Sequence, residues 1–157
     1  MANKVKVISQ SQKWTAMGIV AAYVKMHPRV SVEDLQKAFP ASEINNTLDT
    51  VENIGKADKS GKFDEKMSKQ IEDMDMYVTL KDGTKVAFTN PMWPADKFKK
   101  MTKLAQKYGI DFEVDDAEKG AGKRGRYRLE VTKSKTWLWI LLVLIVIAIV
   151  IAVATLK

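Results

Sequence analysis

The chain has 157 residues, a formal net charge of +7, 46% hydrophobic residues and no cysteine. This length accommodates one small domain, a connector and a terminal segment, and excludes a second sizeable core. The lack of cysteine excludes disulfides, thiolate nucleophiles and thiolate metal sites, and fits a reducing compartment.

The basic excess lies in the C-terminal quarter of the chain. Residues 1–116 contain 18 Lys/Arg against 17 Asp/Glu, whereas residues 117–157 contain 8 against 2. The charge is therefore not a property of the folded part, and we do not expect nucleic acid as a partner.

Three helices are predicted near the N-terminus. Residues 1–10 are an N-terminal arm in which 4–8 alternate like a short strand, and arm and strand both remain open. A helix over 11–26 ends at His27-Pro28. A second begins after the N-cap Ser31 and ends before Pro40, and a third spans 41–53 with Ile44, Leu48 and Val51 on one face.

A β-hairpin is predicted after a polar segment. Residues 56–75 are charged and predict a mobile insertion that contains one short helix. Residues 76–88 hold two alternating runs joined by Asp82-Gly83, which predicts a hairpin with a type I′ turn.

A further helix and a second hairpin complete the predicted domain. Asp96 caps a helix that ends near Tyr108-Gly109. The alternating runs 110–114 and 127–131 predict a second hairpin. The fold class is thus α+β, with three N-terminal helices, a β-hairpin, a helix and a second β-hairpin in a cytosolic domain over 11–132.

A resemblance covers more than half of the chain. It rests on Val24-Lys-Met-His-Pro-Arg-Val-Ser-Val-Glu-Asp-Leu-Gln-Lys-Ala-Phe-Pro40, on the strand–turn–strand at 80–86, and on the loop from Asn90 to the helix 98–108. This arrangement resembles a small helical-plus-β-hairpin, winged-helix-like module of uncharacterised bacterial proteins. The resemblance implies a shared fold and a bacterial or mobile-element origin, and no reaction.

Residues 137–156 carry no charge and predict one C-terminal transmembrane helix. At 1.5 Å per residue, about 20 residues span the roughly 30 Å hydrocarbon core of a bilayer. Trp137 and Trp139 fit a membrane interface, and Ala148 and Ala152 form a small-xxx-small pair for helix packing. Basic residues on the N-terminal side, including the connector 133–136, predict a tail-anchored, single-pass protein of the inner membrane with its N-terminus in the cytoplasm.

The basic residues beside this segment have two interpretations. They form a patch that binds anionic lipids of the bilayer, or they are a solvated hairpin tip that also sets membrane topology. The patch comprises Lys119, Lys123, Arg124, Arg126, Arg128, Lys133 and Lys135.

No catalytic residue, metal ligand set or cofactor site is predicted. His27 is the only histidine, and the glycines of 119–128 lack the P-loop spacing, so neither a His-based triad nor a nucleotide loop is supported. Trp93 is a candidate partner contact, although an aromatic residue at the base of a hairpin is the commoner case.

Three functional hypotheses follow. The first is a non-enzymatic, membrane-held module that binds an unknown protein partner. The second is an effector of the phage-defence or toxin type that forms homo-oligomers and disrupts membranes. The third is membrane-tethered DNA binding by a winged helix, which the acidic residues Glu43, Asp49 and Glu52 oppose because they would repel phosphates.

Overall fold

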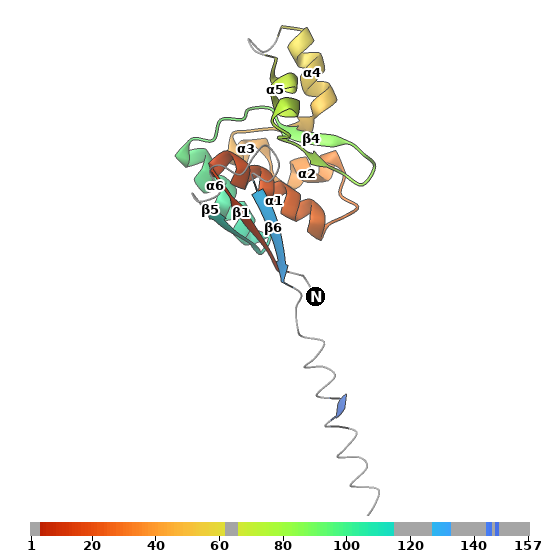
Figure 1. Ribbon diagram of the computed structural model, residues 1–157, viewed down its shortest axis with the longest axis vertical. Helices are drawn as coiled ribbons and strands as arrows, with labels where there is room; N and C mark the ends of the chain where they lie inside the picture. The colour runs from red at the N-terminus through yellow and green to blue at the C-terminus, as the bar shows by residue number, and fades with distance from the viewer. Residues whose placement is uncertain (1–3, 62–65, 115–126, 133–143, 146, 148–157) are drawn as a thin grey trace, which may run out of the picture.

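The computed structural model describes residues 4–61, 66–114, 127–132, 144–145 and 147. Within them the chain is an α+β protein with two three-stranded sheets (Figure 1). The helices are α1 (Gln12–Met26), α2 (Val32–Ala38), α3 (Ala41–Ile44), α4 (Val51–Lys59), α5 (Met67–Asp73) and α6 (Ala95–Lys107). The strands are β1 (Lys4–Ser9), β2 (Leu48–Thr50), β3 (Val78–Thr79), β4 (Lys85–Phe88), β5 (Ile110–Val114) and β6 (Tyr127–Thr132).

The N-terminal segment is the central strand of the first sheet, whose order is β5-β1-β6. β1 runs parallel to β5, with Val7 opposite Phe112, and antiparallel to β6, with Val7 opposite Leu129. The predicted second hairpin is therefore wrong, because β5 and β6 each pair with β1 and not with each other. Alternation identified both strands but carries no information about which strand lies between them.

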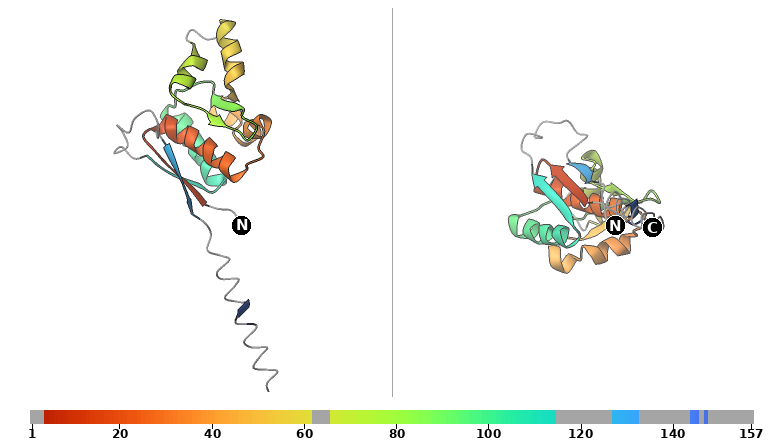
Figure 2. Two further views of the ribbon diagram at one scale, coloured as in Figure 1. Left: turned by 45° about the vertical axis from the view of Figure 1, so that its right-hand side comes forward. Right: turned by 90° about the horizontal axis from the view of Figure 1, so that it is seen from below.

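Helix α1 lies between the two sheets, as Figure 2 shows (left). All nine residues from Trp14 to Ala22 are buried. A helix that is apolar on every side is suited to such a position, because each of its faces meets protein. Val5 and Val7 of β1 pack with Met17, Ile19 and Val20 of α1 in the main core.

The second sheet has the order β2-β4-β3, and its β3–β4 hairpin lies where the sequence predicts it. The turn differs from the predicted type I′. Gly83 has φ +88°, but Asp82 is not among the residues with positive φ, whereas a type I′ turn needs positive φ at both central residues. The Leu80 amide donates to the Thr84 carbonyl, so the loop has three residues.

The predicted third helix over 41–53 is wrong, because the chain leaves the helix at Asn45. Asn45 has the left-handed φ of 51° and ends α3 after four residues. The buried Asn46 side chain then donates to the Asn90 carbonyl and accepts from the Asn90 amide, which holds β2 against β4. Ile44, Leu48 and Val51 are all buried, but they belong to three different elements.

The segment 56–75, predicted as a mobile insertion, contains the C-terminal end of α4 and all of α5. We call α4 and α5 together the helical arm. The arm projects from the second sheet at the end of the molecule far from the first sheet (Figures 1 and 2). Val51, Ile54 and Ile71 of the arm form a smaller core with Trp14 and Met76.

The predicted C-terminal transmembrane helix requires a correction. None of the helices among the described residues is long and apolar enough to cross a membrane. The longest, α1, has 15 residues and a length of about 22 Å, short of the roughly 30 Å that a bilayer core requires. Residues 137–156 lie outside the described part, apart from Leu144, Ile145 and Ile147.

Candidate functional site

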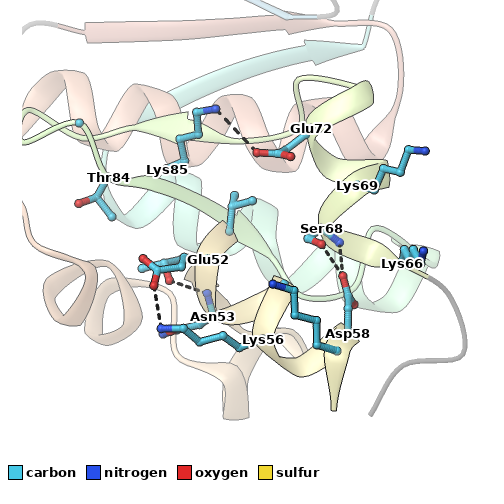
Figure 3. A pocket seen from close by; sticks show the side chains of 15 residues that line it. Glu52, Asn53, Lys56, Asp58, Lys66, Ser68, Lys69, Glu72, Thr84 and Lys85 are labelled. Carbon is cyan, nitrogen blue, oxygen red and sulfur yellow. Dashed lines mark hydrogen bonds and ion pairs between the residues drawn. The ribbon is translucent and has the colours of Figure 1, made fainter. Parts of the chain in front are cut away.

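A cleft of about 1060 Å³ lies between the helical arm and the turn of the β3–β4 hairpin. Figure 3 shows side chains of α4 and α5 on two sides of it and Thr84 and Lys85 on a third. Three successive segments of the chain, 50–59, 66–72 and 83–85, therefore form one concave surface. Its lining residues are Thr50, Val51, Glu52, Asn53, Gly55, Lys56, Asp58, Lys59, Lys66, Ser68, Lys69, Glu72, Gly83, Thr84 and Lys85.

Among the described residues the lining has five lysines and three carboxylates, and each of these carboxylates already has a partner. Glu52 accepts from Lys56 one turn along α4, at 2.7 Å, and this contact holds the pKa of Glu52 below its ordinary value. Glu72 lies 3.9 Å from the Lys85 ammonium. The exposed lysines Lys59, Lys66 and Lys69 have no ion-pair partner among the described residues.

The third carboxylate, Asp58, joins the two helices of the arm (Figure 3). It accepts hydrogen bonds from the backbone amide of Ser68, at 2.8 Å, and from the Ser68 hydroxyl. These donors stand in the first turn of α5, where amides have no partner within the helix, so Asp58 caps a helix other than its own. Partial burial opposes ionisation of Asp58, but the hydrogen bonds from Ser68 and the Met67 amide outweigh it and lower the pKa.

A second, more open cleft of about 690 Å³ lies at the C-terminal end of α1. The Tyr23 ring forms its floor, with ring centroids 4.4 Å from His27 and 4.8 Å from Tyr108. Burial raises the pKa of both tyrosines, and the Tyr108 hydroxyl donates to the Ala38 carbonyl at 2.8 Å. The Tyr23 ring packs against both His27 and Tyr108, so we assign this cleft a packing role.

Of the predicted site residues, the structure describes Trp93 and Arg128, and neither lines one of the two clefts. Trp93 is only 7% exposed and packs edge-on against Phe88, at 4.8 Å between centroids, so its ring belongs to the core. Arg128 lies on β6, beside Glu130. The others lie outside the described residues, and their lipid, interface and helix-packing roles stay predictions: Lys119, Lys123, Arg124, Arg126, Lys133, Lys135, Trp137, Trp139, Ala148 and Ala152.

The lysines of the cleft were missed because residues 56–75 were interpreted as an insertion. A signal was present: Lys56 and Lys59 are three residues apart, as are Lys66 and Lys69, and this spacing places each pair on one helix face. The pairing of α4 with α5 was not available from the sequence, because Asp58 and Ser68 meet only in three dimensions.

Comparisons with known proteins give no relative for this chain. No family model, no curated protein and no solved structure matches it. In the part of the chain that the structure describes, no group of three or more His, Cys, Asp or Glu residues is placed to hold a metal ion.

Proposed function

We propose that this protein is a non-catalytic binding module whose cleft beside the helical arm holds an acidic segment of a partner protein. The observation that carries the proposal is the excess of lysine over carboxylate in a concave site whose carboxylates are already engaged. The cationic groups that remain, on Lys59, Lys66 and Lys69, attract negative charge from outside the molecule.

The shape and mixed chemistry of the cleft support a peptide ligand. Thr84 and Asn53 place uncharged polar side chains among the charges, and the Asn53 amide group, which donates to Asp49 at 2.9 Å, leaves its carbonyl oxygen as an acceptor for a peptide N–H. Lys59 and Lys69 stand on helices α4 and α5, and Lys66 directly precedes α5, so two of the three unpaired lysines are presented by helices.

Nucleic acid is a poorer ligand for the same surface. The described lining has only two more lysines than carboxylates and no arginine, whereas nucleic-acid binding depends on many cationic contacts to phosphates. The third predicted function also needs a recognition helix, but α3 spans only the four residues Ala41–Ile44.

The test measures binding of the full-length chain to a fluorescein-labelled peptide rich in Asp and Glu, by fluorescence anisotropy. One variant combines Lys59→Glu, Lys66→Glu and Lys69→Glu. A control variant makes the same charge change on the exposed lysines of α6, with Lys99→Glu, Lys100→Glu and Lys103→Glu. We expect the cleft variant to weaken binding about tenfold or more and the α6 variant about twofold or less.

Three outcomes contradict the proposal. An equal loss in both variants means general attraction to a basic protein. If a single-stranded oligonucleotide of equal charge binds more strongly than the peptide, with a steep salt dependence, the cleft is a nucleic-acid site. If the peptide does not bind even at low ionic strength, an acidic protein segment is excluded as the ligand of the cleft.

A further inference from the structure

The first sheet leaves two strand edges for other chains to approach. In the described residues β5 and β6 each pair with β1 along one edge, and no described strand pairs with the other edge. Such an edge presents backbone donors and acceptors in a row, and proteins either block it or use it to bind another strand.

One face of β6 packs against the core and its other face is exposed to solvent. Tyr127, Leu129 and Val131 face the main core, yet all three are only partly buried. Arg128 and Glu130 stand on the opposite face, 3.4 Å apart, with side chains 54% and 53% exposed. No proline interrupts the strand.

The pattern of β6 is complementary to itself. In an antiparallel pair that centres on Leu129, Arg128 lies directly opposite Glu130 of the partner subunit, and Glu130 lies opposite the partner's Arg128. The same register sets Tyr127 opposite the partner's Val131 on the core side. Opposite charges and aromatic–β-branched pairs are both favourable directly across an antiparallel ladder.

The other edge has the reverse property. β5 carries Asp111 and Glu113 at the corresponding positions, on the face away from the core. An antiparallel pair of β5 strands centred on Phe112 would place Asp111 opposite the partner's Glu113. Like charges directly opposite each other destabilise a sheet, so β5 resists pairing with itself.

We infer that β6 is a dimerisation edge, where two copies of this chain join their first sheets into one six-stranded sheet with Leu129 at the two-fold axis. The symmetry is that of an isologous interface, since one strand supplies both halves. The inference concerns the opposite end of the molecule from the cleft and does not depend on what the cleft binds.

Charge reversal tests the dimer. The dissociation constant of the full-length chain is measured by sedimentation velocity over a dilution series, in one non-ionic detergent because residues 137–156 are uncharged. Arg128→Glu and Glu130→Arg each place like charges opposite one another twice per dimer. We expect each to raise the dissociation constant about tenfold or more. The double variant exchanges the charges and should return it to within about threefold of the original.

Cysteine cross-linking tests the register, because the chain has no cysteine of its own. A mixture of Arg128→Cys and Glu130→Cys chains should form a disulfide-linked heterodimer on mild oxidation. Directly opposite Cα atoms lie about 4.5–5.5 Å apart, within the range a disulfide needs. Each variant alone should cross-link far less, and Glu113→Cys on β5 should behave like the single variants.

Several results would overturn the inference. One is a monomeric full-length chain at all concentrations. Another is a dimer that both charge reversals leave unchanged, which places the contact elsewhere. A third is equal cross-linking of the mixture and the Glu113→Cys chain. Circular dichroism of each variant checks that these exposed substitutions leave the domain folded.

Discussion

Helix α1 and the helical arm are held in place by different means. α1 is buried along nine consecutive residues between two sheets. In the arm, by contrast, only Val51, Ile54 and Ile71 are buried, and polar contacts such as Asp58 with Ser68 supplement them. The proposed binding cleft therefore lies on the less strongly anchored part of the molecule, where we expect local opening to require less free energy than global unfolding.

A matched pair of isoleucines gives the largest test of this comparison. Ile19 in α1 and Ile54 in α4 are both almost completely buried. Ile19→Ala should cost about 2–5 kcal/mol of the free energy of unfolding, because the surrounding sheets cannot collapse into the cavity. Ile54→Ala should lower the global free energy of unfolding by less. The backbone amides of α4 and α5 should be the first to lose their protection from hydrogen exchange.

Denaturant unfolding and hydrogen exchange read out these two effects. Urea titration gives the global cost, and exchange followed by mass spectrometry gives the protection of each segment. If Ile54→Ala lowered protection in α1 and β1 as much as in the arm, the two regions would form one cooperative unit.

The two helical glycines sharpen the comparison with a smaller effect. A Cβ on Gly18 in α1 would lie 2.4 Å from Val7 Cγ1 and 3.3 Å from the Tyr127 ring, whereas a Cβ on Gly55 in α4 would lie 3.4 Å from Ser68 Oγ. Gly18→Ala should therefore cost about 1–3 kcal/mol through overpacking. Gly55→Ala should gain about 0.5 kcal/mol through helix propensity.

Thermal unfolding of the two alanine variants checks the prediction. The melting temperature should fall for Gly18→Ala and rise slightly for Gly55→Ala. If Gly18→Ala had the same melting temperature as the original chain, α1 and β1 could move apart without loss of stability. That result would contradict close packing of Gly18 against Val7.

The cap between α4 and α5 has a smaller expected effect than either Ile19→Ala or most of the range for Gly18→Ala. Asp58→Ala should cost about 1 kcal/mol at neutral pH, by analogy with other caps. The pKa of Asp58 is lower in the folded chain than in the unfolded one. The stabilisation is thus complete above the unfolded pKa of about 3.9 and is lost as the pH falls through the folded pKa.

Urea titrations at pH 7 and at pH 3 and below measure this effect. The stability difference between the original chain and Asp58→Ala should shrink as the pH falls. Ser68→Ala, which removes the hydroxyl donor but keeps the amide, should give a smaller loss. A difference that grew in acid would mean that the protonated carboxyl forms the cap.

Local signals in the sequence predicted local structure well. The N-cap Ser31 of α2, the end of α1 at His27-Pro28 and the β3–β4 hairpin follow from residues near in sequence. The position of β1 did not follow, since strand order depends on contacts over about a hundred residues. The helix over 41–53 failed because Asn45 and Asn46 outweighed an apolar spacing that fitted a helix.

The candidate sites were less accessible to sequence reasoning than the fold. Positive and negative charges nearly balance in residues 1–116, so composition alone gave no indication that the lysines of α4 and α5 form a basic site. Only the pairing of these helices brings Lys59, Lys66 and Lys69 to one cleft. Likewise, the self-complementary pattern of Arg128 and Glu130 has meaning only once β6 is known to be an edge strand.

The central position of β1 has a consequence for synthesis on the ribosome. β1 is made about a hundred residues before its neighbours β5 and β6. Until then Val5, Val7 and Ile8, all buried in the finished protein, have no strand beside them. The nascent chain therefore carries an apolar strand without neighbours until β5 and β6 are made, and closure of the first sheet is a late step of folding.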